Sequence, residues 1–283
     1  MKSAFQKNDA FIGDVSRSLA SGQRKLWWLG QSGFLIVDRG RAVVLDPYLS
    51  DSLTRKYDGT EKPHVRLTER VVDPAALGAL GVIDVITTSH NHTDHLDAET
   101  LGPLLQKNPE AKLIIPAANR DFVIERLGTG VASRLAELDA GTSTLVAGIQ
   151  FHGVAAAHPT VEHDFSGRCK FLGYVMRWGE FSIYHSGDTL LHDGLVPALR
   201  PFAVHAAVLP INGDHPERGV AGNLDGCQAA KLARDIGARW VVPCHFDLFE
   251  FNTASPDEFV AECQRLSQPY RVLRNGEGWE PHS

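Results

Sequence analysis

The first half of the chain alternates short apolar runs with polar turns. Residues 25–29, 34–37 and 43–45 are apolar, and the charged stretch 38–41 between the last two predicts a hairpin. The polar residues 47–70 form a long connection of the kind that often covers a functional site. Further strands are predicted at residues 82–88, 112–115, 170–177, 181–185, 206–209 and 240–242, with strand-like runs over most of 134–157.

Predicted helices lie between and after these strands. Asp73 and Pro74 supply an N-cap and a proline at the first helical position, and residues 255–258 are interpreted as a capping box with proline in the same place. The N-terminal residues before the first strand are interpreted only as a polar segment. No repeat or low-complexity linker interrupts the order, which favours a single domain over residues 1–283 with two sheets inside and helices outside. Helices are expected at residues 74–80, 98–106, 120–127, 225–236 and 256–266.

Composition and charge exclude several classes of protein. Of the 283 residues, 43% are hydrophobic and 22% are charged, as in a folded globular protein. The net charge is −6 and no block of five like charges occurs, so no nucleic-acid partner is expected. No apolar run suits a membrane span or a secretory signal, and we expect a cytoplasmic protein without a membrane partner. The four cysteines form no C-x-x-C pair and are predicted to be reduced thiols.

The strongest candidate for chemistry is a cluster of histidines. Residues 90–95 are His-Asn-His-Thr-Asp-His, directly after a predicted strand and before a predicted helix. Imidazole and carboxylate are ligands that zinc prefers and that manganese and iron share. A strand end holds alternating side chains on one side, while the turn brings Asp94 and His95 around to the other. The motif therefore predicts two metal ions held side by side, an interpretation we favour over a merely polar surface loop.

This H-x-H-x-D-H motif resembles the signature of the metallo-β-lactamase superfamily. The resemblance implies an α+β fold, a four-layered αβ/βα sandwich, with the metal site at one edge between the sheets. A closer resemblance, to the L-ascorbate-6-phosphate lactonase group, covers most of the chain and is carried by residues 27–30, 90–97, 184–188 and 241–247. The remaining positions of the superfamily pattern each have a candidate that follows an apolar strand: Asp46, His158, Asp188 and His245.

The resemblance also implies roles for these residues. Two divalent ions, zinc or manganese with iron as the weaker alternative, are the implied cofactors. Asp46 is expected to accept a hydrogen bond from a ligand imidazole and so fix its tautomer. His163, five positions beyond His158, stays an alternative to it if the strand register differs. The implied ligands are His90, His92 and His158 for the first metal, and Asp94, His95, His245 and a bridging Asp188 for the second, with Asp94 and Asp188 counted as catalytic.

The function expected from these residues is hydrolysis. Two metals can share a hydroxide, which would attack a small and anionic ester or lactone. Arg168 and Arg218 are the candidate side chains for binding the negative charge of this small-molecule substrate. A phosphodiesterase that acts on a cyclic or small nucleotide is the alternative reaction, and a non-catalytic module that binds a metal or a metabolite is the alternative of another class. The lactonase resemblance further implies a homo-oligomer.

Overall fold

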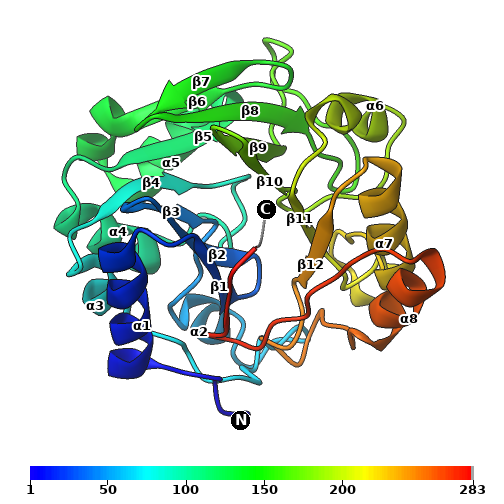
Figure 1. Cartoon of the computed structure of the whole chain (residues 1–283), viewed down its shortest axis with the longest axis horizontal. Coiled ribbons are helices and arrows are strands. Elements are labelled where there is room, and N and C mark those ends of the chain that lie inside the picture. The colour runs from blue at the N-terminus through cyan, green and yellow to red at the C-terminus, as the bar shows by residue number, and fades with distance from the viewer. Residues whose placement is uncertain (282–283) are drawn as a thin grey trace.

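The computed structural model describes residues 1–281, which form two β-sheets packed face to face between outer layers of helices (Figure 1). This arrangement is the α+β sandwich predicted from the sequence. In sheet order, the first sheet contains β13 (Gly278–Trp279), β1 (Lys25–Gly30), β2 (Gly33–Asp38), β3 (Arg41–Leu45), β4 (Ile83–Thr87), β5 (Lys112–Pro116) and β6 (Leu135–Leu138). The second contains β12 (Trp240–Cys244), β11 (Ala206–Pro210), β10 (Phe181–His185), β9 (Leu172–Trp178), β8 (Ile149–Ala155) and β7 (Ser143–Val146).

Helices cover the outer face of each sheet. Those that pack on the first sheet are α1 (Asn8–Ser21), α3 (Pro74–Gly78), α4 (Ala98–Lys107) and α5 (Arg120–Leu127). Those that pack on the second sheet are α6 (Leu195–Leu199), α7 (Gly226–Asp235) and α8 (Asp257–Leu266), and α2 (Ser52–Lys56) lies in the long polar connection after β3. No helix within residues 1–281 combines the length and the apolar character needed to cross a membrane.

Strand β1 shows how the layers are assembled from alternating side chains. Trp27 and Leu29 belong to the core under the outer helices, whereas Leu26 and Trp28 belong to the core between the two sheets. All four side chains are buried because both faces of the strand are covered. Successive residues of a strand point to opposite faces, so one continuous apolar run supplies both cores.

Parallel pairing brings the functional strand ends together. Strand β3 pairs in parallel with β4 in the first sheet, and β10, β11 and β12 pair in parallel in the second. Parallel neighbours place their carboxyl ends at the same edge of a sheet. The segments that follow β3, β4, β10 and β12 therefore start from common edges of the two sheets, and they contain Asp46 and every predicted ligand except His158, which follows β8.

Three parts of the fold differ from the sequence-based predictions. The N-terminal segment is helix α1, whose apolar side chains at positions 11, 12, 15 and 19 pack on the core under the outer helices. This spacing is a helical period that the interpretation as a merely polar segment overlooked. The predicted capping box at residues 255–258 is wrong, because Pro256 is itself the N-cap of α8 and makes no side-chain cap. Strand β6 pairs in parallel with β5 in the first sheet, so the run over 134–157 divides between both sheets.

Candidate metal centre

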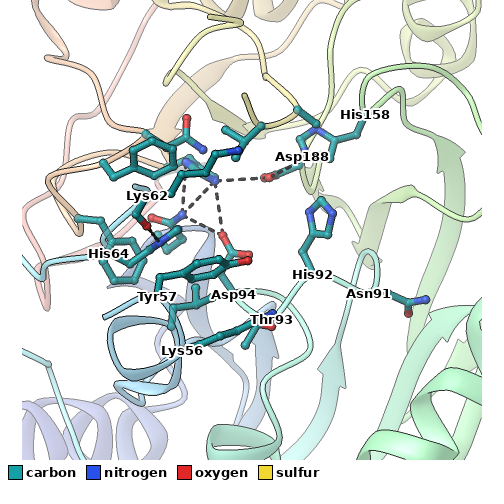
Figure 2. A pocket seen from close by; sticks show the side chains of 18 of the residues that line it. Lys56, Tyr57, Lys62, His64, Asn91, His92, Thr93, Asp94, His158 and Asp188 are labelled. Carbon is teal, nitrogen blue, oxygen red and sulfur yellow. Dashed lines mark hydrogen bonds and ion pairs between the residues drawn. The ribbon is translucent and has the colours of Figure 1, made fainter. Parts of the chain in front are cut away.

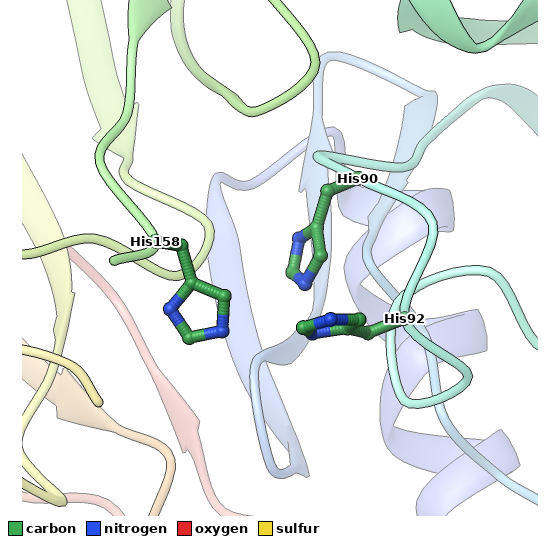
Figure 3. Close-up of side chains that lie close together, drawn as sticks. All are labelled: His90, His92 and His158. Atoms are coloured by element: carbon green, nitrogen blue, oxygen red, sulfur yellow. The ribbon is translucent and has the colours of Figure 1, made fainter. Parts of the chain in front are cut away.

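The first group of ligands combines two histidines of the loop after β4 with one that follows β8. The ring nitrogens offered by His90, His92 and His158 all lie within 4.8 Å of one another. Figure 3 shows the three rings turned toward a common point from two separate segments of the chain. The ring centroids are 4.6 Å apart for His90 and His92, and 5.1 Å apart for His92 and His158. Three converging imidazoles are a donor set that zinc and related divalent ions accept.

The second group mixes imidazoles with carboxylates. Asp94, His95, Asp188 and His245 also offer ligand atoms that lie within 4.8 Å of one another. Nε2 of His95 lies 3.2 Å from Oδ1 of Asp188, and Nε2 of His245 lies 3.4 Å from Oδ2 of the same carboxylate. Oδ2 of Asp188 is also 3.8 Å from Nε2 of His158 in the first group. Asp188 therefore lies between the two groups, where a bridging ligand has to be.

Contacts on the far side of several rings fix which nitrogen faces the centre. Nδ1 of His95 is 2.7 Å from Oδ2 of Asp46, and Nδ1 of His158 is 2.8 Å from the carbonyl oxygen of Gly222. Both partners only accept, so Nδ1 donates the hydrogen and Nε2 keeps its lone pair. The Asp46 contact is the one expected from the sequence. Nδ1 of His90 is held by the hydroxyl of Ser89 at 2.9 Å.

Burial leaves two of these nitrogens without any partner. Nε2 of His90 and Nε2 of His95 are inaccessible to solvent and accept or donate no hydrogen bond among the described residues, although Asp188 lies close to His95. An unpaired buried polar atom costs about 1–3 kcal/mol. A cation bound to each nitrogen removes this cost, so the donor sets of both groups fit divalent metal ions.

The two groups differ in charge. Burial lowers the pKa of His90 well below its ordinary value, and burial also lowers the pKa of His92 and of His158. These rings are neutral at pH 7, the form that binds a metal. In the second group burial acts in the same direction on His245, but the Asp188 and Asp94 carboxylates together outweigh burial and raise the pKa of His245 to about 9. The carboxylates of this group thus attract positive charge strongly.

A cavity of about 670 Å³ opens beside both groups (Figure 2). His92, Asp94, His158, Asp188 and His245 line it, so ligands from both groups are reachable from one space. A cavity of this size accommodates a small organic molecule. The other lining residues come from the β1–β2 turn, the connection after β3, the loop after β4, helix α5, the segment between β11 and α7 and the loop after β12: Gln31, Leu53, Lys56, Tyr57, Lys62, His64, Asn91, Thr93, Phe122, Arg126, Gly219, Val220, Ala221, Phe249, Phe251 and Asn252.

Comparison with known families decides the family of this chain. Residues 41–246, which include every side chain of both ligand groups and Asp46, match the family model described as "Beta-lactamase superfamily domain". The chain belongs to the β-lactamase superfamily. This result agrees with the resemblance seen in the H-x-H-x-D-H motif at the level of the superfamily.

Individual relatives in the superfamily are distant. A protein from Aeropyrum pernix named "UPF0173 metal-dependent hydrolase" is 25% identical over 264 residues, covering 90% of this chain and 97% of its own length. The solved structure of Igni18, described as a novel metallo hydrolase from Ignicoccus hospitalis, shares the fold with a TM-score of 0.65 at 20% identity over 90% of this chain and 97% of that one. The structure of the isothiocyanate hydrolase from Delia radicum gut bacteria has a TM-score of 0.68 at 14% identity. The match covers 92% of this chain and 100% of that one.

The structure separates the predicted site residues into those that converge and those that do not. All seven predicted ligands and Asp46 converge at the superfamily motif, and His158 rather than His163 belongs to the first group. Arg168 lies outside the cavity lining and pairs with Asp164 at 2.7 Å. Arg218 also lies outside the lining, and its guanidinium donates hydrogen bonds to the backbone oxygens of Asn212 and Thr253. Neither position supports the substrate-binding role expected from the sequence.

Two residues that sequence reasoning missed, Gln31 and Phe171, contact the ligands directly. Nε2 of Gln31 lies 2.9 Å from Oδ2 of Asp94 and 3.0 Å from Nε2 of His245. Phe171 packs against the first group, with its ring 5.1 Å from that of His90. Gln31 carries a weak signal, a polar residue after a tryptophan-rich strand, whereas Phe171 resembles any other residue at the start of a strand.

Proposed function

We propose that this chain is a metal-dependent hydrolase that acts on a small anionic ester or lactone. The observation that carries the proposal is the convergence of seven ligand side chains into two donor groups beside one cavity, with Asp188 between them. The superfamily and the hydrolase names of its relatives support the same reaction class. We infer that two divalent ions, zinc or manganese, are the cofactors.

The two donor groups suggest which residues would hold each metal. The first metal would be held by His90, His92 and His158, and the second by Asp94, His95, His245 and Asp188. When bound, the metals would lower the pKa of the water that acts as nucleophile and would polarise the carbonyl oxygen that is attacked. The protein's own part includes Asp46, Ser89 and the carbonyl oxygen of Gly222, which hold three of the rings with Nε2 toward the centre.

The charge of the cavity wall favours an anionic substrate. Within residues 1–281, the lining contains the cations Lys56, Lys62 and Arg126, while its only carboxylates are Asp94 and Asp188. Both carboxylates belong to the metal ligands, whose negative charge bound cations neutralise. Lys56 makes no ion pair with any described residue and lies over the ring of Tyr57. The wall therefore attracts negative charge, and this attraction is strong inside a partly enclosed site.

Apolar side chains complete the wall and indicate a small organic acid rather than an inorganic ion. Leu53, Phe122, Phe249 and Phe251 line the cavity together with Val220. Binding pockets for small molecules typically combine such surfaces with a few polar groups that fix orientation. An acyl or sugar body on the apolar wall with a carboxylate or phosphate at the lysines satisfies both features.

The test compares two reaction classes on one metal-loaded preparation. We expect turnover of a phosphorylated sugar lactone to exceed turnover of bis(4-nitrophenyl) phosphate, with zinc or manganese supplied. His92→Ala is expected to reduce lactone turnover to the rate without metal, whereas His152→Ala, outside the cavity, leaves it unchanged. Preference for the diester points instead to a phosphodiesterase. Tight metal binding with no turnover of either compound points to the non-catalytic module.

A further inference from the structure

His64 faces the candidate metal centre from the connection after β3 without being one of its ligands. It lines the cavity together with Asp94 and His245, and Figure 2 shows His64 and Tyr57 on the same side of the cavity as Asp94. The side chain is half-buried. Nothing in the superfamily motif marks this histidine, because it lies 26 positions before His90.

Aromatic rings hold the imidazole of His64 in place. The ring of Tyr57 stacks on it with centroids 4.6 Å apart and an interplanar angle of 28°. Phe249 and Phe251 each lie 5.2 Å from it on other sides. The backbone is tied as well, since the hydroxyl of Thr54 donates to the carbonyl oxygen of His64 at 2.7 Å. A side chain fixed by several independent contacts offers its polar atom in a constant direction.

One hydrogen bond determines the tautomer of this ring. Nδ1 of His64 is 2.9 Å from the carbonyl oxygen of Lys62, which only accepts. Nδ1 therefore carries the hydrogen and Nε2 carries the lone pair. Nε2 makes no hydrogen bond with any described residue, and it is accessible to solvent on a ring that lines the cavity. The ring thus presents a proton acceptor to whatever occupies that space.

The surroundings keep this acceptor neutral. Burial lowers the pKa of His64, and His245 and Lys56 add to the lowering, while the bond to the carbonyl oxygen of Lys62 and the Asp94 carboxylate oppose it in part. The other titratable groups of the wall outside the ligand set are Lys56, Tyr57, Lys62 and Arg126. Imidazole is the side chain whose ordinary pKa lies close to neutral pH. His64 is therefore the wall residue suited to take up a proton and release it again.

We propose that His64 transfers the proton during hydrolysis, an inference that rests on the proposed function. Nε2 of His64 accepts a proton from the attacking water as the oxygen of that water bonds to the acyl carbon. The bond between the acyl carbon and the leaving oxygen then breaks, and the leaving oxygen takes the proton from Nε2. One water is consumed, an acid and an alcohol are formed, and His64 returns to its neutral Nδ1–H form.

The tautomer can be tested on the protein without substrate. Nitrogen-15 NMR of the metal-loaded full chain, with the His64 signals assigned by their loss in His64→Gln, is expected to show a protonated Nδ1 and an unprotonated Nε2 at pH 7. A ring with hydrogen on Nε2, or a doubly protonated ring at this pH, overturns the proposal. This measurement does not depend on which substrate the enzyme prefers.

The proton transfer itself can be tested with two anionic esters that share one acyl group. Monoethyl adipate releases a poor leaving group that needs a proton, whereas mono-4-nitrophenyl adipate releases a phenolate that does not. General acid–base catalysis contributes about 10²–10⁴-fold. We therefore expect His64→Gln to lower kcat for the ethyl ester by about 100-fold or more and for the nitrophenyl ester by only a few-fold. His64→Phe, which keeps an aromatic ring between Tyr57 and Phe249, is expected to behave alike.

The control is His152, a half-buried histidine that packs against Phe202 and lies outside the cavity lining. His152→Gln is expected to leave the ratio of the two rates unchanged. Equal losses on both esters in the His64 variants overturn the proton-transfer role while the proposed function stands. A wild-type enzyme that cleaves neither adipate ester nor the phosphorylated lactone removes the proposed function, and the role of His64 with it.

Discussion

Asp46 offers a direct test of how the ligand rings are held. Its Oδ2 is 2.7 Å from Nδ1 of His95 and 3.1 Å from the backbone nitrogen of Ser89, and its Oδ1 accepts from the hydroxyl of Thr87 at 3.0 Å. Asp46 also has a positive φ of 38°, a region that asparagine tolerates as well as aspartate. Asp46→Asn can therefore keep the backbone and the shape of the side chain.

In Asp46→Asn the amide oxygen can still accept from His95, and the amide nitrogen can donate to the hydroxyl of Thr87, which turns to accept. What is lost is the negative charge behind the imidazole of His95, which makes Nε2 a weaker donor to a metal. Substitutions of such partners typically cost 10–100-fold in metal affinity. Because each tenfold change in Kd corresponds to about 1.4 kcal/mol, we expect the free energy of metal binding to be less favourable by about 1.4–2.7 kcal/mol.

Isothermal titration of the metal-free protein with zinc or manganese measures this effect. Asp38→Asn is the matched control, because Asp38 is also buried in the first sheet and pairs with Arg24 at 3.0 Å, away from the cavity. That control is expected to lower thermal stability without changing metal affinity. Wild-type affinity in a correctly folded Asp46→Asn protein would refute the idea that the Asp46 charge strengthens the centre.

Three further predictions concern the bound metal, the hydrogen bonds of Arg126 and the lysines of the cavity wall. Removal of metal with a chelator should lower the midpoint of thermal unfolding in calorimetry, since a ligand at 100 times its Kd stabilises the folded state by about 2.7 kcal/mol; an unchanged midpoint contradicts a metal-holding centre. Arg126→Met removes the bonds from Nη1 to the carbonyl oxygens of Asn91 at 2.8 Å and Leu96 at 3.0 Å, and should lower the free energy of unfolding in urea by about 1–3 kcal/mol. Replacing Lys56 and Lys62 by glutamine should raise KM for monoethyl adipate by about tenfold and leave KM for neutral ethyl butyrate unchanged; equal changes argue against an anion-binding wall.

The chain order of the ligands was accessible from the sequence because each ligand follows an apolar strand. The motif at residues 90–95 and the strand ends before Asp46, His158, Asp188 and His245 are visible without coordinates. Parallel pairing brings together the ends of β3 and β4 and the ends of β10 and β12, and it follows from the alternation of strands and helices. Strand β8, which precedes His158, joins the second sheet through antiparallel pairs instead. The predicted positions of the ligands agree with the structure because each of them lies at the end of a strand that the local sequence pattern already marks.

Contacts between distant segments could not be predicted in this way. The roles expected for Arg168 and Arg218 were assigned without knowledge of their contacts, and both guanidinium groups are bound by partners that sequence spacing does not reveal. The position of His64 depends on how a long polar connection folds over the cavity. Helix α1, by contrast, carries a readable signal, because its apolar residues Phe11, Val15 and Leu19 recur every four positions.

The central claim is that side chains from four strand ends hold two metal ions with Asp188 between them. Anomalous diffraction from a crystal of the full chain grown with manganese tests it most directly. We predict two anomalous peaks, one among His90, His92 and His158 and one beside Asp94 and His245, with Asp188 in contact with both ions. A single peak elsewhere, or no peak at these side chains with manganese in excess, would contradict the account.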